Sequence, residues 1–167
     1  MGLNSARDDV SEGELGDEQL EWAVHQFQAC QLENRIMALH HHLIAVPYSG
    51  RQRNTLVDAG DVLEMARLCN VDLVLMGHKH VPHAYFLGNL TLLYCGTTCS
   101  EKVRADEPPC FNRIILDEDT IKVSLVNSIN LEESLLLSRK RGETDFIKPR
   151  KTRIDHILQS KVFQNSP

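Results

Sequence analysis

The stretch Asp72-Leu73-Val74-Leu75-Met76-Gly77-His78-Lys79-His80 decides the fold class, because a run of apolar residues ends directly in Gly-His-Lys-His. A short apolar run before glycine predicts a strand in the interior of a sheet. Side chains alternate across an extended chain, so we expect His78 and His80 on one side and Lys79 on the other. Gly77 leaves room for the backbone to turn or to approach an ion. The stretch therefore predicts a strand that presents two candidate metal ligands at its end.

A second predicted strand, residues 35–39, also ends in imidazoles, because it is followed by His40, His41 and His42. Open α/β sheets build their sites beyond the carboxyl ends of the strands, and imidazole is the commonest protein ligand of transition metals. Adjacent strand residues point to opposite faces, so His41 and His42 need not be ligands. The other three histidines, His25, His83 and His156, lie outside the two clusters and are interpreted as solvated or structural.

Helical and hairpin patterns surround the two strands. Apolar residues recur at helical spacing over residues 20–27 and again over 62–69, with Asn70 as a terminator. Gly88-Asn89 joins two apolar runs that predict a hairpin over residues 84–94, and a second hairpin is expected over 113–126. Strands that alternate with helices predict an α/β fold.

Four motifs in order resemble the C-terminal half of a calcineurin-like metallophosphoesterase, most closely its class III cyclic-nucleotide phosphodiesterase branch. They are Ala38-Leu39-His40-His41-His42-Leu43, Leu75-Met76-Gly77-His78-Lys79-His80-Val81-Pro82, Cys95-Gly96-Thr97-Thr98-Cys99-Ser100 and Pro109-Cys110-Phe111-Asn112-Arg113-Ile114. His42 and Leu43 stand where that branch usually has two prolines. The resemblance extends over residues 1–126 and implies the C-terminal half of a four-layer α/β/β/α metallophosphoesterase sandwich.

Three further motifs of that family, Asp-x-His, Gly-Asp and Gly-Asn-His-Asp/Glu, do not occur in their expected places. Gly60-Asp61 is out of order for the second of them and is interpreted as a helix start. Residues 1–5 resemble the interior strand that follows the third motif. The sequence is therefore expected to be an N-terminally truncated phosphoesterase, and its partner is either the missing N-terminal half or another chain.

The resemblance implies a binuclear site that hydrolyses a phosphoester or phosphodiester of a small molecule. His40 and His78 would bind one divalent ion and His80 the other, with iron, manganese or zinc as the type of metal. The residues that act on the leaving group belong to the absent motifs, so no catalytic residue is assigned in this chain. His41, Arg51 and Arg53 are candidate substrate-binding residues, because guanidinium groups match phosphate oxygens.

Composition limits the class of protein. The chain has 167 residues, 42% of them hydrophobic, and a formal net charge of −5, which is typical of one globular domain. It contains neither a long apolar run nor a signal-like N-terminus, so we expect no membrane association and a cytoplasmic location. The five scattered cysteines are expected to be reduced thiols; Cys95 and Cys99 are not interpreted as half of a zinc site.

The C-terminal end differs from the rest. Residues 139–161 contain eight Lys/Arg and three acidic side chains. We therefore predict a phosphoesterase half-domain over residues 1–137 and a basic, solvated tail over 138–167, for which nucleic-acid binding is not expected because aromatic residues are not interleaved.

Three hypotheses stand at this point. The chain is a metal-dependent phosphoester hydrolase that is incomplete and weakly active or inactive alone, or a shortened inactive homologue that serves as a binding or partner module. The third alternative is an unrelated α/β protein that holds one ion with three histidines. Metal stoichiometry separates the three.

Overall fold

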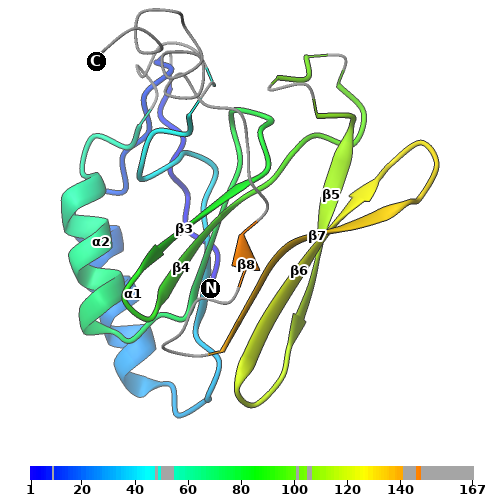
Figure 1. Ribbon diagram of the computed structural model, residues 1–167. Helices are drawn as coiled ribbons and strands as arrows, with labels where there is room; N and C mark the ends of the chain where they lie inside the picture. The colour runs from blue at the N-terminus through cyan, green and yellow to red at the C-terminus, as the bar shows by residue number, and fades with distance from the viewer. Residues whose placement is uncertain are drawn as a thin grey trace, which may run out of the picture.

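The computed structural model describes residues 1–8, 10–47, 49, 55–100, 102–104 and 107–140, together with the backbone of residues 146–147. The helices and strands of this part of the chain are shown in Figure 1. In chain order they are α1 (Asp17–Ala29), β1 (Ile36–Ala38), α2 (Ala59–Leu68), β2 (Leu73–Met76), β3 (His83–Leu87), β4 (Leu90–Tyr94), β5 (Cys110–Leu116), β6 (Thr120–Asn127), β7 (Glu133–Lys140) and β8 (Phe146–Ile147).

The first sheet has the strand order β1-β2-β4-β3. Strands β1, β2 and β4 run parallel, with Ala38 beside Leu75 and Leu75 beside Leu93, and β3 pairs antiparallel with β4. Residues 1–3 lie along the outer edge of β1, where Gly2 forms a parallel bridge with Ala38. The carboxyl ends of β1 and β2 therefore lie next to each other, as expected for a site formed by the histidines that follow these two strands.

The second sheet has the order β5-β6-β7-β8, with antiparallel pairs throughout. Both predicted hairpins are confirmed: β3 and β4 meet at Gly88, whose φ of 60° suits glycine, and β5 and β6 pair over their whole length. The sequence interpretation did not include β7. Its apolar residues Leu135, Leu136 and Leu137 are consecutive, so they carry no alternation that would have indicated a strand.

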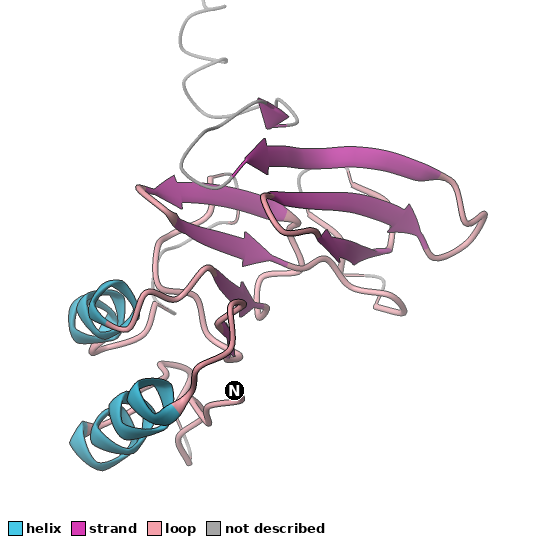
Figure 2. Ribbon diagram, turned by 90° about the horizontal axis from the view of Figure 1, so that it is seen from below, coloured by secondary structure: helices cyan, strands magenta, loops and turns pink. Residues whose placement is uncertain are grey.

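Two apolar cores separate three layers. Helices α1 and α2 cover one face of the first sheet, where Phe27 and Val62 pack with Met37 and other buried residues. The opposite face of that sheet packs on the second sheet through residues such as Leu93 and Val123. Figure 2 shows both helices on the same side of the strands. The α/β fold class is thus confirmed, with helices, first sheet and second sheet as successive layers.

The helix ends agree with the interpretation in most details. Helix α2 includes Gly60 and Asp61 in its first turn, which confirms that this pair begins a helix, and Asn70 follows the helix with a left-handed φ of 49°. Helix α1 begins at Asp17, and Gly16 occupies its N-cap. Neither described helix combines the length and apolarity needed to cross a bilayer.

The predicted division at residue 138 falls within β7, which continues to Lys140. Arg139 is buried in the sheet, with its guanidinium 4.6 Å from the centre of the Phe86 ring. Most of the predicted basic tail lies outside the described residues.

Candidate metal centre

Histidines from two strand ends meet at the carboxyl edge of the first sheet. His40 and His41 follow β1, and His78 follows β2. Gly77 donates its N–H to the His40 carbonyl at 3.0 Å, which holds the two strand ends together. Three imidazoles are therefore fixed by adjacent parallel strands, and not by a long loop.

The ligand atoms of His40, His41 and His78 all lie within 4.8 Å of one another. Nε2 of His40 and Nδ1 of His78 are 2.9 Å apart and share a hydrogen bond. In a tetrahedral zinc site, two nitrogens at about 2.0–2.1 Å from the ion lie about 3.4 Å apart. If these two nitrogens moved slightly apart, one divalent ion could replace the proton that they share. Because the ligand atom of His41 lies within 4.8 Å of both, the three nitrogens fit a single ion.

Ser5 and Gly13 position His41 from the N-terminal segment. The Ser5 hydroxyl lies 3.0 Å from Nδ1 of His41 and accepts the backbone N–H groups of His40 and His41. A side chain at Gly13 would collide with the His41 ring and the Ser5 carbonyl, so this position requires glycine. Sequence analysis missed both residues, since nothing in their spacing connects them with the imidazoles.

Burial favours the neutral form of two of the imidazoles, those of His41 and His78. Desolvation, followed by repulsion from His41 and His40, lowers the pKa of His78 from 6.5 to about 4. Desolvation and the neighbouring His40 also lower the pKa of His41. A neutral imidazole is the form that binds a metal, so His41 and His78 are prepared for ligation at neutral pH.

His80 does not belong to this group of three. Its Nδ1 lies 3.2 Å from the Lys102 carbonyl oxygen. The predicted alternation fails here, because β2 ends at Met76 and both His78 (φ 71°) and His80 (φ 56°) adopt left-handed backbone conformations. The chain turns instead of continuing as a strand, and Lys79, which was expected to face away, is buried. The assignment of His80 to a second ion stays a prediction.

His42 is a buried imidazole whose two ring nitrogens both lack a hydrogen-bond partner among the described residues. It is only 1% exposed, and its ring centre lies 6.0 Å from that of His78. Desolvation, then the charges of Lys79 and His41, lower its pKa from 6.5 to about 4. The sequence resemblance placed a proline here, so the burial of an unsatisfied polar ring was not expected.

The arginines near the cluster and the histidines outside it remain to be placed. Arg51 and Arg53 lie outside the described residues, so their predicted phosphate contact is untested. Arg104, which sequence analysis did not select, is exposed and donates a hydrogen bond of 2.6 Å to the Ser49 carbonyl. His25 and His83, interpreted as non-ligands, are not members of the cluster.

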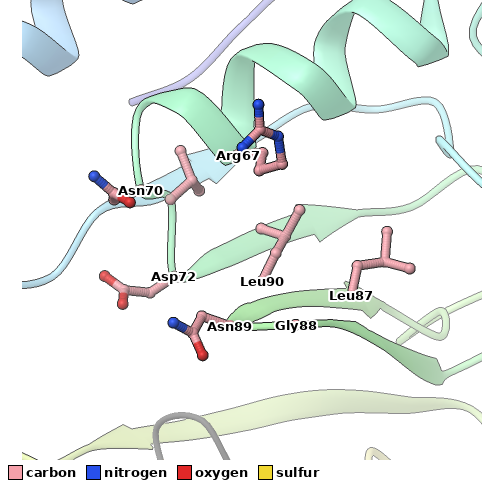
Figure 3. Close-up of a pocket in the computed structure, with 8 residues that line it drawn as sticks. Arg67, Asn70, Asp72, Leu87, Gly88, Asn89 and Leu90 are labelled. Atoms are coloured by element: carbon pink, nitrogen blue, oxygen red, sulfur yellow. The ribbon is translucent and has the colours of Figure 1, made fainter.

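A cavity of about 540 Å³ at the opposite end of β2 is shown in Figure 3. Its polar side chains already have structural roles: the Asp72 carboxylate accepts the Arg35 N–H at 2.8 Å, and Arg67 forms an ion pair with Glu64. Asp72 precedes β2 whereas His78 follows it, so this cavity is separate from the imidazoles.

Comparison with known proteins supports the fold. No protein-family model matches the sequence, and no curated protein matches it. The chain is similar to a solved structure of GAP50, described as the anchor in the inner membrane complex of Plasmodium, with a TM-score of 0.57 and 17% identity over 81% of this chain and 44% of that one. It is also similar to the structure of PhoD, with a TM-score of 0.52 and 12% identity over 89% of this chain and 40% of that one.

The chain thus spans less than half the length of these two solved structures. Similarity to these two structures supports the α/β fold class expected from the sequence. At such low identity the likeness concerns the fold alone.

Proposed function

We propose that this chain supplies the imidazole ligands of a metal-dependent phosphoester or phosphodiester hydrolase, similar to the cyclic-nucleotide phosphodiesterases, and that it is weakly active or inactive alone. The single observation that carries the proposal is the convergence of His40, His41 and His78 at the ends of two parallel strands. The fold likeness to metallophosphoesterase-type structures supports it.

Each residue would have a distinct task. His40, His41 and His78 would hold a divalent ion, and Ser5 would orient His41. The ion, of iron, manganese or zinc type, would supply a nucleophilic water and neutralise charge on the phosphoryl oxygens. By the family resemblance, His80 would contribute to a second ion, and His41, Arg51 and Arg53 would contact the substrate.

The composition of the cluster explains the expected weak activity. The group of three contains only neutral ligands, and no carboxylate joins it in the described part of the chain. A two-metal cluster needs anionic bridging ligands to offset four positive charges. We therefore expect one ion per isolated chain. The five cysteines are free, which supports our proposal of a reducing, cytoplasmic location.

The alternative function is a binding or partner module without turnover. It is favoured because no carboxylate joins the three imidazoles in the described part of the chain. Under this alternative the imidazoles are polar residues of an interface and hold no ion tightly.

Metal stoichiometry and turnover test the proposal together. Purified chain is equilibrated with Zn²⁺ or Mn²⁺, bound metal is counted by mass spectrometry, and hydrolysis of bis(p-nitrophenyl) phosphate is followed. One bound ion that is lost in His78→Ala, with turnover near the metal-free background, is the expected result. Chain that binds no ion would favour the partner module, and two bound ions with rapid hydrolysis would contradict the expected incompleteness.

A further inference from the structure

The loop that follows β1 carries two of the three clustered imidazoles, yet it has little regular backbone structure. Beyond His40 the chain leaves the sheet, and residues 41–46 form neither a helix nor a strand, apart from an isolated bridge between His42 and Thr55. Buried backbone groups outside regular structure need other partners for their hydrogen bonds. The side chains that bind this loop therefore determine where its imidazoles lie.

The Tyr94 hydroxyl is such a partner for Ile44. It donates a hydrogen bond of 2.9 Å to the Ile44 carbonyl and accepts the Ile44 N–H at 3.3 Å. Tyr94 is only 1% exposed, so water does not compete for these two bonds. One phenol thus satisfies both backbone groups of a single loop residue.

Neighbouring aromatic rings hold this phenol in place. Tyr85 of β3 packs on the same core as Tyr94, and the two ring centres lie 6.0 Å apart at an interplanar angle of 83°. Its hydroxyl donates a hydrogen bond of 3.0 Å to the Ala45 carbonyl. His83 packs edge-on against Tyr85, with 4.6 Å between the ring centres. Edge-to-face ring pairs are a favoured arrangement, so the two phenols form a rigid support for the loop.

The position of Tyr94 in the sheet connects this support with the other strand of the metal centre. Tyr94 ends β4 and pairs with Met76, the last residue of β2. The loop that it binds comes from β1, on the other side of β2. The phenol therefore joins the two sides of the strand that leads to His78. Ser5 binds the start of the same loop from the outer side of β1, so the loop is held at both ends.

We propose that Tyr94 is a positioning residue of the metal centre. By binding both backbone groups of Ile44, its hydroxyl keeps the loop in the conformation that brings His41 to His78. Tyr94 acts on the ion only through this loop. Groups that orient metal ligands in this way change metal affinity by about 10–100-fold when they are removed. The inference rests on the proposed metal-binding function and adds a residue to it.

The test removes the hydroxyl and keeps the ring. Zinc affinity is measured at pH 7.5 by competition with a chromogenic chelator, in protein shown to be folded by circular dichroism. We expect Tyr94→Phe to bind zinc about tenfold more weakly than the natural protein, at the lower end of the usual range for such groups. Tyr85→Phe should show a smaller loss, because its hydroxyl binds one loop carbonyl and no N–H.

A matched control separates positioning from a general loss of stability. Val123 is completely buried between the two sheets and belongs to the other apolar core. Val123→Ala should lower the midpoint of urea unfolding and leave the zinc affinity of the folded protein unchanged. A Tyr94 that served stability alone would behave in the same way as Val123.

Amide exchange in the metal-free protein gives a second readout, measured by NMR. Tyr94→Phe should speed exchange at the His41 and Ile44 N–H groups by a larger factor than at Thr91. The Thr91 N–H donates to the Asp72 carbonyl at the other end of the first sheet and reports on global stability.

Three results would overturn the inference. These are natural zinc affinity in folded Tyr94→Phe, equal losses of zinc affinity in Tyr94→Phe and Val123→Ala, and equal acceleration of exchange at His41, Ile44 and Thr91. If the natural protein binds no zinc, the proposed function fails by itself. Exchange in the metal-free protein then still decides whether Tyr94 holds the loop.

Discussion

Replacement of His42 by leucine should stabilise the protein at pH 7.5. Both ring nitrogens of His42 are buried without a partner in the part of the chain that the structure describes, and leucine has a similar volume and no polar atoms. An unsatisfied buried donor or acceptor costs about 1–3 kcal/mol. Taking about 2 kcal/mol and the usual 2–4 °C per kcal/mol for a chain of this size, the melting temperature should rise by about 4–8 °C.

Acid should increase this difference. The pKa of His42 is about 4 in the folded protein, against 6.5 for an ordinary histidine, so the unfolded chain binds the proton more readily between these values. The stability of the natural protein therefore falls as pH decreases from 6.5 to 4, by about 3 kcal/mol from this residue. The His42→Leu variant should not show this fall in stability, because leucine does not bind a proton. His78 contributes a loss of the same direction to both proteins, so only their difference reports on His42.

Urea unfolding at pH 7.5 and at pH 5 measures both effects, in metal-free protein. His25→Leu on the exposed side of α1 is the matched control and should change stability by less than about 0.5 kcal/mol. If His42→Leu is less stable than the natural protein at pH 7.5, or if the difference does not grow at pH 5, then His42 has a polar partner in the folded protein and the reasoning is refuted.

Three further predictions concern the cluster and the sheets. His78→Ala should weaken zinc binding by more than about tenfold and His80→Ala by much less, as measured by chelator competition; equal losses would show that His80 is a ligand of the same ion. Gly13→Ala should displace the His41 ring and weaken zinc binding, whereas Gly2→Ala, which meets open space, should leave zinc titrations unchanged. Arg139→Met should lower the free energy of unfolding, measured in urea, by about 2–3 kcal/mol, because the Thr91 hydroxyl and the Gly88 carbonyl lose their charged donor. Ordinary surface substitutions change this free energy by no more than about 0.5 kcal/mol, so a change within that range would contradict the prediction.

The sequence by itself determined both helices, the two predicted hairpins and the edge of the sheet where the histidines meet, but not strand β7. Helical spacing, the Gly88-Asn89 turn and the apolar run before Gly77 are properties of neighbouring residues, so periodicity predicted them correctly. His40 and His78 follow two strands that proved to be parallel neighbours, and such strands bring their carboxyl ends together.

Only the tertiary structure decided which imidazoles form the cluster. His41 joins it because Ser5 and Gly13 hold its ring from a distant part of the chain. His80 is directed toward Lys102 because two left-handed residues end the alternation that an extended strand would have continued. Backbone turns and packing across the sheet depend on residues far apart in sequence, and short-range spacing contains no record of them.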